Sequence, residues 1–144
     1  MNATRPGFAL AGALFAGLAL AGSRVAIVNE TSLAQMWAPD PTQTHFVAGY
    51  PSKAADPSAD VCVTIGYQVG DKGITSDFTE LKSWTSAHPD GVLAAEEVAP
   101  YTQIAAAVVS RTRYVPVGKA HAVFTSATFV FDGGKSIIWQ GQSC

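Results

Sequence analysis

The chain is poor in net charge, in cysteine and in catalytic motifs, and each shortage excludes a class of function. It has 144 residues, of which nine are basic and 11 are acidic, giving a formal net charge of −2. No basic patch or stripe is present, which argues against nucleic acid as a partner. The length predicts one globular domain, and no internal repeat or low-complexity segment follows residue 21.

Motifs for metal binding and catalysis are also missing. The three histidines, His45, His88 and His121, have no partner at the i, i+4 spacing and no carboxylate at metal-ligand spacing. Glu96 and Glu97 form an adjacent carboxylate pair, but neighbours on a helix do not face each other. No Gly-x-Ser-x-Gly elbow and no phosphate-binding loop occurs. The sequence therefore predicts no catalytic residue, no metal site, no cofactor and a protein that is not an enzyme.

The N-terminal segment has the composition of a secretory signal peptide. Arg5 precedes the uncharged run Phe8–Ala21, which ends in the small-x-small sequence Ala19–Ala21. Arg24 interrupts the run before it reaches the ~20 apolar residues of a spanning helix. We expect a signal peptide at 1–21, an N-terminal extension at 22–49 and a folded domain at 50–144. The predicted location is the periplasm, and the alternative is an inner-membrane anchor formed by the same segment.

The chain has two cysteines, Cys62 and Cys144. Export would place both in an oxidising compartment, where disulfides persist. A bond between them would stabilise the fold by roughly 4–5 kcal/mol, provided that the two Cα atoms lie within about 7 Å. The alternative is a pair of unbonded thiols, one buried in a strand and one at the chain end.

Alternation of apolar residues predicts a β-hairpin in the first half of the domain. In Val61–Val69 every second residue is apolar or aromatic, which is the period of a strand with one buried face. The turn residues Asp71–Gly73 follow, and the chain resumes as Ile74–Trp84. We expect the hairpin to span Val61 to about Trp84.

Shorter elements are predicted before the hairpin. Val25–Val28 has the composition of a short strand, and Thr31–Trp37 that of a helical turn capped by Thr31 or Ser32. Tyr50–Ala55 is predicted to be a very short helix with proline at its first position.

The second half contains one strong helix followed by two strands. Pro100 precedes the predicted helix Tyr101–Thr112, whose apolar stripe includes Ile104 and Val108. Val92–Val98 is rich in Ala and Glu and is a possible further helical turn. Val123–Phe131 alternates as a strand, residues 132–135 (Asp-Gly-Gly-Lys) predict a turn, and Ile137–Gln140 is the last strand.

These elements predict an α+β fold, with a small antiparallel sheet and two helices packed on one face. The predicted core contains residues from the hairpin, the helix and the strand after it: Val63, Ile65, Tyr67, Phe78, Leu81, Ile104, Val108, Val123, Phe129 and Phe131.

The order of the elements resembles the C-terminal domain of TonB, the periplasmic protein that couples inner-membrane energy to outer-membrane transporters. Tyr50-Pro51-x-x-Ala54 is similar to the opening of that family's first helix, and the hairpin to its first strand and turn. Tyr101–Val109 is similar to its Ala-rich second helix, and Thr112–Pro116 to the segment that leads to its last strand. The resemblance covers residues 50–131 and implies a stand-alone TonB-like module with an added C-terminal strand.

The resemblance implies a non-catalytic periplasmic protein of a Gram-negative bacterium that binds a protein or peptide by β-strand addition, in connection with transmembrane transport. The partner implied is a segment of an outer-membrane transporter, with no small-molecule cofactor. The candidate edge is Val123–Phe131, or Ile137–Gln140 if that strand is outermost. The candidate binding residues are Phe129, Phe131, Ile137, Trp139 and Arg113.

Several side chains have two possible roles. Trp84 and Trp139 are core residues or exposed anchors for a peptide or sugar, because aromatic side chains dominate binding hot spots. Arg111 and Arg113 bind a partner's carboxylate or complement the end of the helix. The alternative function is a small periplasmic enzyme or enzyme inhibitor, which requires a pocket with clustered titratable groups. A third is a structural role in the cell envelope.

Overall fold

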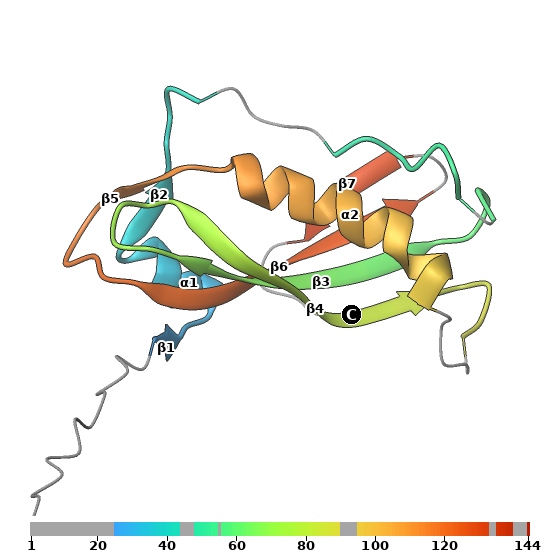
Figure 1. Ribbon diagram of the computed structural model, residues 1–144, viewed down its shortest axis with the longest axis horizontal. Coiled ribbons are helices and arrows are strands. Elements are labelled where there is room, and N and C mark those ends of the chain that lie inside the picture. The colour runs from blue at the N-terminus through green and yellow to red at the C-terminus, as the bar shows by residue number, and fades with distance from the viewer. Residues whose placement is uncertain (1–24, 44–47, 55, 90–94, 133–134, 140–143) are drawn as a thin grey trace, which may run out of the picture.

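The computed structural model describes residues 25–43, 48–54, 56–89, 95–132, 135–139 and 144. The expected signal peptide, His45 and the glycines of the last turn lie outside these residues, as does Gln140. The described chain is a mixed α+β fold (Figure 1). Its elements in chain order are β1 (Ala26–Ile27), α1 (Glu30–Ala34), β2 (Trp37–Pro39), β3 (Val61–Val69), β4 (Thr75–Thr85), α2 (Ala95–Arg111), β5 (Tyr114–Pro116), β6 (Val123–Asp132) and β7 (Lys135–Trp139).

The main sheet is built around the neighbours β3 and β6. The order is β1-β6-β3-β4, and β7 pairs with β6 on the side where β1 also lies. All pairs are antiparallel except β1 with β6. β3 and β6 stay in register along their length, from Val61 opposite Phe131 to Val69 opposite Val123. The expected hairpin, the strand after the helix and the added C-terminal strand are therefore confirmed.

A small second sheet was not expected from the sequence. β2 pairs antiparallel with β5, with Trp37 opposite Pro116. The indole N–H of Trp37 donates to the carbonyl of His121 at 3.0 Å, and the ring is buried. This sheet and α1 connect the segment before residue 50 to the same core, because Leu33 and Trp37 belong to it.

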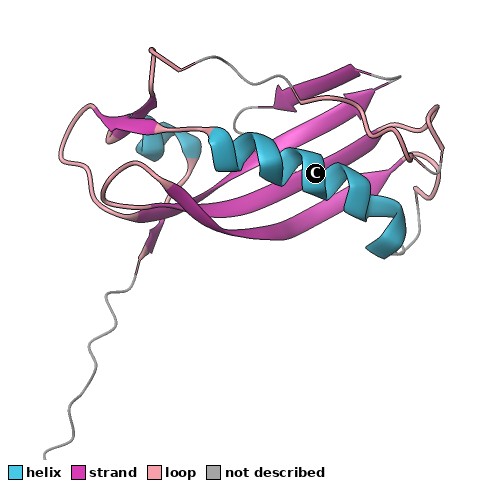
Figure 2. Ribbon diagram, turned by 45° about the horizontal axis from the view of Figure 1, so that its top comes forward, coloured by secondary structure: helices cyan, strands magenta, loops and turns pink. Residues whose placement is uncertain are grey.

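Helix α2 lies across one face of the main sheet, and the core fills the space between them (Figure 2). The alternating residues of β3 and β6 meet the buried side of the helix. The core residues of these three elements are Val61, Val63, Ile65, Tyr67 and Val69, then Val98, Tyr101, Ala105 and Val109, then Val123, Phe129 and Phe131. Six of the ten predicted core residues are fully buried, and Ile104 and Val108 are partly buried against the core.

The core prediction is wrong for Phe78 and Leu81, whose relative exposures are 38% and 54%. Both lie on β4, where the pairing with β3 shifts register twice. Each shift places an extra residue in β4, so the two-residue alternation changes face at each bulge. Asp77 lies at one of the shifts and has φ 55°, a left-handed conformation that is uncommon outside glycine. Simple alternation therefore cannot assign the faces of β4.

The helices begin elsewhere than the sequence predicts. No helix forms among the described residues of 50–54, so the helix expected at Tyr50–Ala55 is wrong. Helix α1 begins after Asn29, whose side-chain oxygen accepts the Ser32 N–H at 2.9 Å, and neither Thr31 nor Ser32 is the cap. Helix α2 begins at Ala95 and contains Pro100, although proline was expected to lie outside it.

A single proline is tolerated in α2 because of where it lies and what the helix buries. Pro100 is in the second turn, and the hydrogen bond it cannot donate would reach the carbonyl of Glu96. Packing of the helix residues from Val98 to Val109 on the sheet offsets that loss. Neither helix of the described residues combines the length and the hydropathy that crossing a bilayer requires.

Candidate functional site

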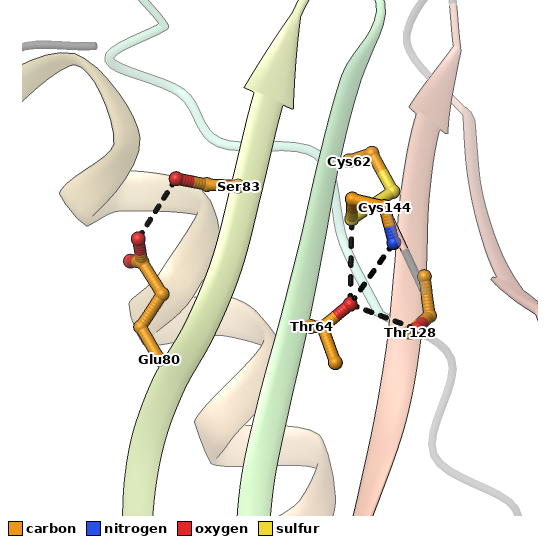
Figure 3. The surroundings of a disulfide bond; sticks show 6 residues. All are labelled: Cys62, Thr64, Glu80, Ser83, Thr128 and Cys144. Carbon is orange, nitrogen blue, oxygen red and sulfur yellow. Dashed lines mark hydrogen bonds between the residues drawn. A yellow bond between two sulfur atoms is a disulfide. The ribbon is translucent and has the colours of Figure 1, made fainter. Parts of the chain in front are cut away.

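Cys62 and Cys144 form a disulfide, as the sequence favoured. Their Cα atoms are 5.8 Å apart, within the reach of such a bond. Cys62 alternates with core residues of β3, so it faces the side of the sheet that α2 leaves uncovered, which we call the helix-free face. Figure 3 shows Cys144 on this side of β3, with α2 behind the strands.

Two threonines support the disulfide. The Thr64 hydroxyl lies 2.9 Å from the Thr128 hydroxyl and accepts the backbone N–H of Cys144 at 3.3 Å (Figure 3). Both threonines are buried, although they point away from the helix-covered core. The chain end is therefore fixed over the central strands β3 and β6, and it covers this part of the helix-free face.

The predicted binding residues on β6 have buried side chains. Phe129 and Phe131 are 1% and 0% exposed and belong to the core under α2. Strand β6 is also an inner strand, with β3 on one side and β1 and β7 on the other. Ile137 and Trp139 lie on β7, opposite Val130 and Thr128, and their side chains are outside the description.

Arg113 lies at the end of α2 and is exposed. Its guanidinium donates to the carbonyl of Ser110 at 3.3 Å, so it satisfies a carbonyl of the last helical turn. Its backbone N–H donates to the Gln43 side chain at 2.8 Å. The observed contacts match the reading in which this arginine complements the helix end.

Strand β4 forms the opposite border of the sheet. Beyond a bridge between Ile74 and Arg113 near its start, no strand of the described chain pairs with its outer edge. From Lys82 to Thr85 its residues pair one to one with residues 64 to 61 of β3, without a register shift. This short regular stretch is an edge on which no further strand of the described chain lies. Lys82 and Trp84 in it are exposed, whereas Thr85 is buried and its carbonyl accepts the His88 N–H.

Apolar side chains accompany this edge on the helix-free face. Trp84 pairs with Cys62, so the two side chains share a face, and the indole is 40% exposed. Leu81 and Phe124 lie over Gly66, where an added Cβ would come within 3.0 Å of Leu81 and 2.7 Å of Phe124. Trp84 is thus partly exposed, as the anchor reading requires.

Polar contacts on the helix side hold the same edge in place. The Glu80 carboxylate accepts hydrogen bonds from the Ser83 hydroxyl at 2.8 Å and from the Thr102 hydroxyl of α2. Thr75, at the other end of β4, donates to the carbonyl of Val109 at 2.9 Å. These bonds connect an exposed strand to the helix, so its outer edge is preformed.

A pocket of about 360 Å³ opens where β4 ends, between the starts of β3 and α2. Its walls come from three separate segments of the sequence, within residues 56–61, 85–88 and 97–101. The residues that line the pocket are Asp56, Ala59, Val61, Thr85, Ala87, His88, Glu97, Val98 and Tyr101. The turn after β4 is fixed because the His88 N–H donates to the Thr85 carbonyl at 3.3 Å and the Ser86 N–H to the Asp60 carbonyl at 2.9 Å.

His88 and Glu97 pair at the mouth of this pocket. The imidazole Nε2 lies 3.4 Å from a Glu97 carboxylate oxygen, and both side chains are at least one-third exposed. The Ser58 hydroxyl and N–H donate to the Asp56 carboxylate and hold its pKa below the ordinary range. Asp56 is therefore ionised at neutral pH, and the pocket contains two carboxyl groups.

Tyr101 is the aromatic residue in the pocket lining, and its ring packs against two further rings. Tyr101, Tyr50 and Phe131 meet edge to face, with centroids 5.0 to 6.3 Å apart. The Tyr50 hydroxyl donates to the Pro57 carbonyl at 3.1 Å, so the Tyr101 hydroxyl donates to Tyr50 across 3.3 Å. Burial, followed by this hydrogen bond, raises the pKa of Tyr101. The ring is thus a neutral, fixed wall.

Sequence reasoning missed this pocket. The sequence predicted no catalytic or metal-binding role for His88 or for the pair Glu96 and Glu97. His88 and Glu97 are nine positions apart in the sequence, and no fixed spacing signals that they meet. Glu96 is exposed. His121 is exposed and contributes its backbone carbonyl to the Trp37 bond.

No protein-family model, no curated protein and no solved structure matches the chain. Within the described ranges, no group of three or more His, Cys, Asp or Glu side chains is placed to hold a metal ion. The geometry of the β4 edge and of the pocket beside it is therefore the basis for a functional proposal.

Proposed function

We propose that the protein binds an extended segment of a protein or peptide by strand addition along the outer edge of β4. The observation that carries this proposal is the regular stretch Lys82–Thr85 at the border of the sheet, which pairs with β3 on one side and with no strand of the described chain on its outer side. An edge strand presents backbone N–H and C=O groups on alternate residues, and an added strand satisfies them. The proposal moves the binding edge to β4. The first edge expected from the sequence, Val123–Phe131, lies on the inner strand β6, and the alternative, Ile137–Gln140, lies up to Trp139 on β7, which pairs with β6 only among the described strands.

Side chains near the edge supply selectivity under this proposal. On the helix-free face, the exposed part of Trp84 offers an aromatic surface beside the added strand. Truncating such an anchor commonly costs about 2 kcal/mol or more of binding free energy. On the helix side, the bonds of Glu80 to Ser83 and Thr102 keep the strand in place before the partner arrives, which lowers the entropic cost of binding.

The irregularities of β4 limit pairing to this stretch. Two register shifts interrupt the strand before Lys82, and Asp77 between them has a left-handed backbone. Natural edge strands use bulges and charged residues to avoid indiscriminate pairing. The proposed edge is therefore short, which favours a partner segment of a few extended residues over a second sheet edge.

We place this activity in the periplasm, as the resemblance to the TonB C-terminal domain implies. The disulfide supports an oxidising compartment, because such bonds are rare where thiols are kept reduced. The partner under this proposal is an extended segment of an envelope protein, with an outer-membrane transporter segment as the first candidate. Binding requires no bond-making chemistry.

A backbone-modified peptide tests strand addition directly. The probe is a short acetylated and amidated peptide of alternating Thr and Val, with Gln at both ends, titrated into the full disulfide-bonded chain and followed by amide chemical shifts. We expect shifts at Lys82–Thr85. Two further peptides carry N-methyl groups on alternate residues, one on the even set and one on the odd set. One of them must lose binding and the other must keep it, because only alternate N–H groups face the edge.

Side-chain variants provide the control. Trp84→Ala is expected to weaken binding about tenfold or more, whereas Val117→Ala removes an exposed apolar side chain outside β4 and leaves affinity unchanged. Equal binding by both N-methylated peptides, or no shift at millimolar peptide, would refute strand addition at this edge.

A second candidate function, a small enzyme or enzyme inhibitor, is favoured by the pairing of His88 with Glu97 in a pocket. A carboxylate that orients an imidazole is one element of general base catalysis. Within the described chain, Glu97 is the side-chain partner found for the imidazole. Release of nitrophenol from p-nitrophenyl acetate, lost in His88→Gln, would support this candidate. A rate equal to that of free imidazole would count against it.

A further inference from the structure

We infer that the pocket at the end of β4 selects a lysine or arginine side chain carried by the bound segment. The inference rests on the proposed strand addition and adds to it the chemistry of one partner residue. Three features support it: the continuity of the pocket with the edge, the charge of its rim and the apolar character of its inner walls.

The pocket continues the edge without a gap. Thr85 is the last residue of β4, pairs with Val61 at the start of β3, and lines the pocket with it. Ala87 and His88 extend the lining beyond the strand end, and their positions are fixed because both N–H groups donate to Thr85. A segment paired along Lys82–Thr85 therefore brings one of its ends to the pocket mouth.

The charge at the mouth favours a cation. The pocket is lined by two carboxyl groups, Asp56 and Glu97, and by no lysine or arginine of the described chain. The partial positive charge of the α2 N-terminus is opposed by Glu96 and Glu97 in its first turn. The two carboxylates would repel an anionic side chain. An ammonium or guanidinium group can replace His88 as the partner of the Glu97 carboxylate.

The inner walls match the stem of such a side chain. Ala59, Val61 and Val98 are buried apolar residues that line the pocket, and Tyr101 closes it. Lysine and arginine place their methylene stems against apolar surface and keep the charged group at a polar rim. The volume of about 360 Å³ lies within the range for ligand pockets, so the pocket has room for one such side chain.

The experiment compares peptides that differ at one end. The alternating Thr and Val probe carries Lys, Gln or Glu at its first position in one set and at its last position in another. Binding to the full oxidised chain is measured by calorimetry. We expect Lys to bind about tenfold tighter than Gln at one end only, and Glu to bind more weakly than Gln at that end.

Two isosteric variants locate the effect. Glu97→Gln is expected to abolish the preference for Lys over Gln. Glu96→Gln removes the same charge from the same helical turn but at an exposed residue outside the pocket, so the preference is retained. Asp56 is not substituted in this experiment, because its carboxylate accepts hydrogen bonds from Ser58 that hold the turn.

The outcomes separate the inference from the proposed function. If the Gln peptide binds and shifts the β4 amides but Lys gives no gain, or if the two glutamate variants behave alike, the pocket inference is overturned and strand addition stands. If the Gln peptide fails to bind, strand addition itself is refuted. A peptide that binds through Lys alone, without shifts in β4, contradicts the connection between pocket and edge.

Discussion

Removal of the Cys62–Cys144 disulfide is expected to destabilise the protein strongly. The bond closes a loop of 82 residues, which contains β3, β4, α2 and all later elements. For a loop of this length the chain-entropy model gives about 4.5 kcal/mol, because the bond restricts the unfolded chain. The hydrogen bond between the Cys144 N–H and Thr64 in the folded chain adds to this loss.

The measurement is urea unfolding of the oxidised chain and of the double variant Cys62→Ala/Cys144→Ala. We expect the free energy of unfolding to fall by about 4 to 5 kcal/mol, and the melting temperature by roughly 10–20 °C. The m value should rise, because the unfolded chain without the bond exposes more surface. Reduction with dithiothreitol is expected to reproduce the variant. A loss below about 1 kcal/mol would refute the reasoning, since it would leave the loop entropy without effect.

Two further predictions concern the backbone and the buried hydroxyls. Gly73→Ala is expected to lower the free energy of unfolding in urea by at least about 2 kcal/mol, because Gly73 has φ 71° and an added Cβ would lie 1.9 Å from the Tyr114 carbonyl oxygen. Gly49→Ala should lower it far less, because nothing lies within 4 Å of the added Cβ, and equal losses in the two variants would contradict this account. Burial raises the pKa values of Tyr67 and Tyr101, so both stay protonated in the folded chain above pH ~10, where unfolded tyrosines ionise. The unfolded state then binds fewer protons, and the free energy of unfolding should fall by about 1.4 kcal/mol per pH unit for each tyrosine. Tyr67→Phe should reduce that slope, and a free energy of unfolding that does not change above pH ~10 would refute the prediction.

The sequence predicts the centre of the fold well. In Val61–Val69 and Val123–Phe131, alternation predicts strands with one buried face, and both strands lie side by side in full register. Each of these strands has neighbouring strands on both sides, so packing within the sheet reinforces the alternation of apolar residues. The disulfide also agrees with the sequence, because a chain with two cysteines has one possible intramolecular pairing.

The edge of the fold is less predictable for a physical reason. The bulges of β4 shift Phe78 and Leu81 out of the expected pattern, and no residue type in that stretch signals where an extra residue is inserted. The short pairing of β2 with β5 depends on two segments that α2 and the main sheet bring together. The pocket likewise forms from three separate segments of the sequence, so only the folded chain brings its charged groups together.

Hydrogen exchange of the β4 amides tests the central claim most directly. The full oxidised chain is exchanged with and without the alternating Thr and Val peptide, and each backbone amide is followed separately. The account predicts slower exchange for alternate residues of Lys82–Thr85 on binding, with the amides of β7 unchanged. Protection of Lys135–Trp139 in their place, or no protection anywhere, would contradict the claim that the outer edge of β4 is the binding edge.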